Sequence, residues 1–129
     1  MKKKVGIAVI VVGLAVVSAI PVFAATDSSA STSAYIGYSQ QSSSYVRGKA
    51  YARSTNSKFQ SINVSATFYQ GSTKKESGTG TTTTKGDEAT WYTKDSTYSS
   101  SNSYTLNSAS RTYYTDGTSS DQSYATGTW

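Results

Sequence analysis

Two stretches near the middle of the chain alternate between small or apolar side chains and polar ones. In residues 44–54 the small or apolar positions are Val46, Gly48, Ala50 and Ala52, and in residues 59–69 they are Ile62, Val64, Ala66 and Phe68. A period of two is typical of a β-strand with one buried and one solvated face. A polar turn at residues 55–58 joins the stretches, so the sequence predicts a β-hairpin. The small residues of the first strand predict close approach of a facing sheet or of large aromatic rings.

Turn signals divide the rest of the chain into further short strands. Asp116 and Gly117 form the strongest of them, because Asp-Gly is favoured in hairpin turns. A threonine run interrupted by Gly78 and Gly80 is typical of an edge strand, with a possible bulge. The additional strands are predicted at residues 35–39, 73–85, 88–93, 104–114 and 122–129, with a serine-rich loop at 96–103. About seven short strands predict a small all-β, two-sheet antiparallel β-sandwich of immunoglobulin-like architecture, with a small barrel as the alternative.

The first 24 residues have the three-part pattern of a secretory signal peptide. Three lysines at 2–4 precede an apolar run over 5–20, which predicts a signal helix, and Pro21 stands shortly before Ala24. We expect cleavage between Ala24 and Ala25, and hence a secreted, extracellular protein. An uncleaved membrane anchor is the alternative, because the apolar run approaches membrane-spanning length. No polar or positive flank that would stop transfer follows the run.

The chain beyond residue 24 is poor in aliphatic side chains and rich in aromatic ones. Residues 25–34 are small and polar and predict a flexible linker, followed by a single domain over residues 35–129. The only valine, isoleucine and leucine residues after position 24 are Ile36, Val46, Ile62, Val64 and Leu106. So few are typical of disorder, which is the alternative to a fold. Eleven tyrosines and two tryptophans supply apolar mass instead, and abundant Ser, Thr and Tyr favour strands.

The sequence contains neither histidine nor cysteine, which excludes Ser-His-Asp and Cys-His nucleophiles and the usual zinc sites. We therefore expect no enzyme activity, no cofactor and no metal. A pair of glycosidase carboxylates would have to come from Asp87, Glu88 and Asp95, which we expect instead to be a turn cap and solvated strand ends. Asp116 and Asp121 lack the spacing of a calcium-binding loop.

One predicted strand face is a candidate binding surface. Its outward residues are Tyr45, Arg47, Lys49, Tyr51 and Arg53. Three cations interleaved with two tyrosines suit an anionic polymer, such as a cell-wall glycopolymer, or an acidic protein. The alternative is an ordinary solvated face whose charges discourage aggregation.

A sugar-stacking platform of aromatic residues is a second possibility. The residues concerned are Trp91, Tyr92, Tyr113, Tyr114, Tyr124 and Trp129. With five aliphatic residues available, we expect these aromatic side chains to be used for the core.

These observations favour a small secreted, non-catalytic bacterial binding or adhesion module at the cell surface or in the medium. Strands of the VRGKAYARS and INVSATFYQG kind are similar to those of small exported proteins of Gram-positive bacteria. We expect a cell-wall polymer, a glycan or another surface protein as partner, and membrane contact only before cleavage. After residue 24 the chain has nine Lys and Arg residues and seven Asp and Glu residues, which gives a net charge of +2. So small a charge does not indicate binding to nucleic acid. Two alternatives are a bacteriocin-like antagonistic protein and a self-assembling matrix component.

The cleavage site is the first testable prediction. When the full chain is expressed in a secreting Gram-positive host, protein in the medium should begin at Ala25, as read by mass spectrometry. Ala24→Tyr removes the small residue that the peptidase requires and should block processing. Recovery of the unprocessed wild-type chain from the membrane fraction would favour the anchor.

Overall fold

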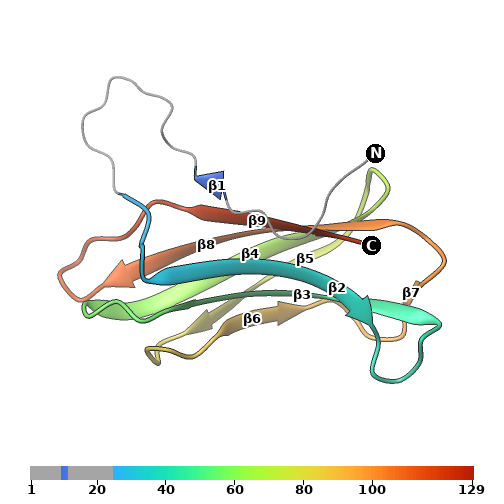
Figure 1. The fold of residues 1–129 in the computed structure, drawn as a ribbon, viewed down its shortest axis with the longest axis horizontal. Helices are drawn as coiled ribbons and strands as arrows, with labels where there is room; N and C mark the ends of the chain where they lie inside the picture. The colour runs from blue at the N-terminus through green and yellow to red at the C-terminus, as the bar shows by residue number, and fades with distance from the viewer. Residues whose placement is uncertain (1–9, 12–24) are drawn as a thin grey trace.

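The computed structural model describes residues 10–11 and 25–129, and all regular structure in these residues is β (Figure 1). The strands are β1 (Ile10–Val11), β2 (Ala30–Tyr38), β3 (Tyr45–Ser54), β4 (Phe59–Gln70), β5 (Thr73–Thr82), β6 (Ala89–Tyr92), β7 (Tyr98–Ser99), β8 (Tyr104–Tyr114) and β9 (Ser123–Thr128). One antiparallel sheet has the order β1-β9-β8-β4-β5 and the other β2-β3-β6, with β7 paired to β3. The predicted all-β fold with two antiparallel sheets is confirmed, and the arrangement is consistent with a β-sandwich.

The two clearest predicted strands form, but the predicted hairpin between them was wrong. Strand β3 pairs with β2 and β6, whereas β4 pairs with β5 and β8 in the other sheet. The turn at residues 55–58 therefore carries the chain from one sheet to the other. Both strands turn their apolar sides towards the same core. The alternation of apolar and polar residues is therefore the same whether the strands are neighbours in one sheet or lie in two sheets that face each other. The hairpin partner of β4 is β5, across Gly71 at φ +60°.

The segment predicted as a linker over residues 25–34 belongs to the fold. Strand β2 begins at Ala30, and Thr32 and Ala34 are buried. Before it, the buried carboxylate of Asp27 accepts hydrogen bonds from the Ser29 backbone N–H (2.9 Å), the Ser54 hydroxyl (2.7 Å) and the Asn56 amide (3.2 Å). The sequence predicted this strand only at residues 35–39, because the buried positions of its first half, Thr32 and Ala34, are small or polar and no apolar period marks them.

Two further segments bear on the sequence predictions. The serine-rich stretch 96–103 contains β7, in which Tyr98 is buried. The signal helix predicted over residues 5–20 lies outside the described residues except at Ile10 and Val11, and these two residues form β1, which pairs with Tyr124 and Ser123 of β9. Within the described ranges, no helix is long and apolar enough to span a membrane.

Aromatic rings at one end of the sandwich compensate for the shortage of aliphatic side chains. Phe68 of β4 stacks on Tyr104 of β8 with ring centroids 5.2 Å apart, and Tyr98 lies 4.8 Å from Phe68. The Tyr98 hydroxyl donates to the Glu76 carboxylate, and the Tyr104 hydroxyl donates to the Ser99 carbonyl oxygen (2.8 Å). Each ring thus buries apolar area while its hydroxyl keeps a polar partner.

Glycines allow the two sheets to close on each other along both lateral edges. At one edge, a Cβ on Gly80 of β5 would collide with the carbonyl oxygen of Thr90 in β6. At the opposite edge, a Cβ on Gly127 of β9 would lie 2.5 Å from the carbonyl oxygen of Ala34 in β2. Because the obstructing atoms belong to the backbone, no rotamer change relieves the contact. The close approach predicted from the small inner residues of β3 is confirmed at Gly48, where an added Cβ would lie 3.2 Å from Leu106.

Gly80→Ala should destabilise the protein, because the methyl group can be accommodated only by moving β5 away from β6. We expect a loss of about 1–3 kcal/mol in the free energy of unfolding, the usual cost of overpacking, measured by urea denaturation. Thr79→Ala is the matched control, since Thr79 is an exposed neighbour on the same strand. Equal stability of the Gly80 and Thr79 variants would show that the sheets are not in contact at this edge.

The Asp27 network should make stability depend on pH. Burial alone would raise the pKa of Asp27, but hydrogen bonds from Ser54, Ser29 and Asn56 outweigh it and hold the pKa below the ordinary 3.8. Because the pKa of Asp27 is lower in the folded than in the unfolded state, the ionised carboxylate stabilises the fold at pH values above the ordinary pKa of 3.8. This stabilisation is lost as the pH falls through the pKa of the folded state. Urea denaturation between pH 6 and pH 2 should therefore show a steeper loss of stability for wild type than for Asp27→Asn. Identical pH profiles would contradict this role of Asp27.

Candidate binding surface

The alternation of β3 places all five predicted surface residues on the outer side of the sheet formed by β2, β3, β6 and β7. Arg47, Lys49 and Tyr51 are half-buried at the centre, while Tyr45 and Arg53 are exposed at the two ends. At about 3.3 Å per residue, the row from Tyr45 to Arg53 extends over roughly 26 Å. The structure therefore brings the predicted residues together as one linear array.

Arg47 is held in place by two neighbours from the segment at β6. Its guanidinium carbon lies 4.1 Å from the centroid of the Tyr92 ring, a cation–π contact. Its Nε–H donates to the carbonyl oxygen of Thr93 (3.2 Å), and the Thr93 hydroxyl in turn accepts from the backbone N–H of Gly48 (2.9 Å). The guanidinium is thus oriented before any ligand arrives.

Lys49 is held differently, by an acid and by aromatic rings. Its Nζ lies 3.1 Å from Oε1 of Glu88 and 4.4 Å from the centroid of the Tyr51 ring. Burial opposes the charge of Lys49, but the hydrogen bond and the negative charge of Glu88 outweigh it, so the pKa of Lys49 is raised. The ammonium stays charged, although Glu88 neutralises part of its field.

Tyrosines from the flanking strands complete the surface. Tyr35 of β2, Lys49 of β3 and Tyr92 of β6 form one row across the three strands. The side chains of Tyr35 and Tyr92 are 59% and 44% exposed. The Tyr35 ring lies over Gly37, where a Cβ would be only 2.5 Å from the Tyr35 hydroxyl oxygen.

Arg47 is the centre of this arrangement. Gly37 pairs with Arg47, so the rings of Tyr35 and Tyr92 both lean towards Arg47 from opposite sides. We name this surface the cationic face and define it by Tyr35, Arg47, Lys49, Tyr51 and Tyr92. Arg47, Lys49 and Arg53 outnumber Glu88, the acid paired with Lys49, so the face is net positive.

Neither Tyr35 as a member of this face nor Glu88 as the acidic partner of Lys49 was predicted from the sequence, and Tyr92 was assigned to the core. Trp91 and Trp129 are partly buried and pack against the core as expected, but Tyr92, Tyr113 and Tyr124 are exposed. The buried aromatic residues are instead Phe59, Phe68, Tyr98 and Tyr104. Trp91 and Tyr92 differ in burial because adjacent residues of a strand point to opposite faces of the sheet. Tyr35 follows the same alternation, because Ala34 and Ile36 on either side are buried.

Three of the candidate carboxylates, those of Glu88, Asp95 and Asp116, have structural partners. Glu88 pairs with Lys49, and the Asp95 carboxylate accepts from the Ser96 backbone N–H (3.0 Å). Asp116 accepts from the Thr118 backbone N–H (3.0 Å) at the turn where Gly117 has φ +87°. In the part of the chain that the structure describes, no group of three acidic side chains is arranged to hold a metal ion.

Comparison with known proteins gave no match: no family model, no curated protein and no solved structure matches this chain.

Proposed function

We propose that this chain is a small secreted, non-catalytic module that binds an anionic polymer of the bacterial cell surface through the cationic face. The observation that carries the proposal is Arg47, fixed by the Thr93 carbonyl oxygen and the Tyr92 ring and flanked by the exposed Tyr35. Ordering a long side chain costs conformational entropy, and here that cost is met during folding instead of on binding.

The chemistry of the guanidinium suits phosphate or carboxylate groups. An arginine carries five N–H donors in a planar fork. Among the described residues, the Nε–H of Arg47 is the donor with a protein partner, so both terminal amino groups are left to bind an anion in bidentate geometry. Tyr35 beside it and Tyr51 further along β3 offer hydroxyl groups and ring faces to the sugar portions of a glycopolymer.

The length of the surface supports a polymer over a small anion. Arg47 and Lys49 lie two residues apart on β3, about 6.6 Å along the strand, and Arg53 lies four residues further on, about 13 Å. A chain with repeated negative charges contacts several of them at once, and simultaneous weak contacts add up to useful avidity. A cell-surface polymer is the matching partner for a protein that carries the pattern of a secretory signal.

An immunoglobulin-like architecture is part of this proposal. With β2, β3, β4, β6, β8 and β9 taken as strands A, B, C, E, F and G, the sheets read A-B-E and G-F-C, and β5 lies beside C. Tyr104 begins strand F and donates its hydroxyl to a carbonyl oxygen five residues upstream, as in the tyrosine corner of such domains.

Self-assembly through sheet edges receives less support. The edge strand β5 carries Lys74 and Lys75, and its pairing with β4 is irregular between Phe68 and Tyr69. Charged residues and bulges of this kind discourage edge-to-edge pairing.

The proposal is tested by sedimentation of the secreted protein with purified Gram-positive cell walls. Wild type should bind, and binding should weaken as salt is added, because exposed charges are screened. Arg47→Ala should weaken binding roughly tenfold or more, since hydrogen bonds to charged groups contribute about 1.5–3 kcal/mol. Arg47→Lys keeps the charge but loses the planar fork, and it should bind with intermediate affinity.

Lys74→Ala is the matched control, because it removes one exposed positive charge from β5, an edge strand of the other sheet. It should bind nearly as well as wild type. The proposal fails if cell walls that have been stripped of their anionic polymers bind the protein equally well. It also fails if the Lys74 and Arg47 variants lose affinity to the same extent while both remain folded by circular dichroism.

A further inference from the structure

The outer face of the other sheet carries a row of uncharged polar side chains across four strands. Ser77 of β5 pairs with Thr67 of β4, Thr67 with Asn107 of β8, and Asn107 with Thr126 of β9. The neighbouring row runs through Thr79, Ser65, Ala109 and Tyr124 in the same strand order. These side chains lie on the far side of the sandwich from the cationic face.

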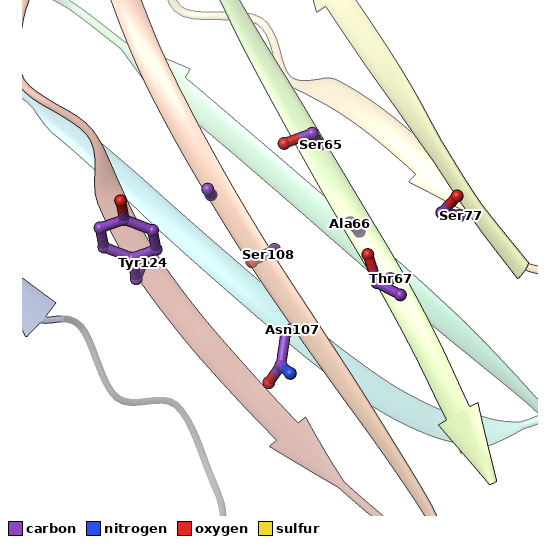
Figure 2. A pocket seen from close by; sticks show the side chains of 8 residues that line it. Ser65, Ala66, Thr67, Ser77, Asn107, Ser108 and Tyr124 are labelled. Carbon is purple, nitrogen blue, oxygen red and sulfur yellow. The ribbon is translucent and has the colours of Figure 1, made fainter. Parts of the chain in front are cut away.

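A hollow of about 390 Å³ opens between these two rows. It forms because Ala109 places a single methyl group between Ser65 on β4 and the much larger Tyr124 on β9. Figure 2 shows hydroxyl groups of Ser65, Thr67 and Ser77 along one side, with Tyr124 on the other. The volume lies within the range of about 300–1,000 Å³ that is typical of ligand pockets.

The ring of Tyr124 provides a stacking surface beside the hollow. Figure 2 looks down on the sheet and shows this ring face-on, and the side chain is 37% exposed. Its hydroxyl donates to Oε1 of Gln122 (2.9 Å), which fixes the ring. A flat exposed ring packs well against the C–H face of a pyranose.

Asn107 supplies an oriented amide next to that ring. Its Oδ1 accepts a hydrogen bond from the hydroxyl of Thr126 (3.0 Å). With the oxygen bound in this way, the Nδ2–H group is the part of the amide that can donate to a ligand. The residues lining the hollow carry no charged side chain, so the site offers hydrogen bonds and an aromatic face without an electrostatic preference.

We infer that this hollow is a second binding site, specific for a neutral polysaccharide. Hydroxyl groups of a sugar match the hydroxyl and amide groups of the lining, and Tyr124 stacks against a sugar ring. The hollow is shallow and open, so it suits an internal segment of an extended glycan lying along the sheet, rather than a buried chain end. It shares no residue with the cationic face and is independent of the function proposed above.

Affinity electrophoresis tests the inference. The secreted protein is run in native gels that contain soluble xylan, β-glucan or mannan, at about 0.5 M NaCl, where exposed charges are screened within a few ångströms. At least one of these neutral polysaccharides should retard wild type. Tyr124→Ala should reduce the affinity roughly tenfold, the usual effect of truncating an aromatic anchor, and Asn107→Ala should also reduce it.

Tyr113→Ala is the matched control. Tyr113 is exposed to a similar degree, 36%, on the same sheet but is not part of the hollow. This variant should be retarded like wild type. The inference is overturned if none of the three polysaccharides retards wild type, or if the Tyr113 variant loses as much affinity as the Tyr124 variant. Because the probes are uncharged, failure here leaves the cell-wall experiment unaffected, and the converse also holds.

Discussion

The close approach of the two sheets is the interaction on which the rest of this structure depends. A chain with five aliphatic residues after position 24 cannot fill a wide space between sheets. It narrows the space instead, by placing glycine or alanine on the inner faces and by letting the backbones of β5 and β6, and of β9 and β2, meet at Gly80 and Gly127. The short contacts between the sheets then provide the van der Waals attraction that larger side chains would otherwise have supplied.

This solution determines the composition of the outer faces. In β3 every inner position from Val46 to Ala52 is a small side chain or valine, so the bulk of the strand lies outside. The large outer side chains of Arg47 and Lys49 lie on a central strand, bounded by β2 on one side and β6 on the other. A binding surface on such a strand is rigid, because its backbone is hydrogen-bonded on both sides and its inner face is packed.

The sequence predicted single strands well and relations between strands poorly. Strand β8 has the predicted bounds, and β3 and β4 expose the predicted sides, because these properties follow from a local period of two. The separation of β3 and β4 into different sheets was not predictable, since both arrangements give the same alternation. Tyr35 belongs to the cationic face because it pairs with Lys49 and because its ring occupies the space above Gly37. Neither relation can be deduced from the sequence.

The two outer faces differ in a way that follows from their neighbours. On the sheet of β2, β3 and β6, Arg47 and Lys49 meet tyrosines across the strands, and the cations are oriented by cation–π contacts and by Glu88. On the other sheet, Ser, Thr and Asn residues pair with one another across four strands, so short uncharged side chains leave a hollow beside Tyr124. We therefore expect binding at the first face to weaken with salt and binding at the second to be insensitive to it. Under the two proposals, the sandwich would hold a glycopolymer through its charges and a neutral chain through its hydroxyl groups, on opposite sides of one core.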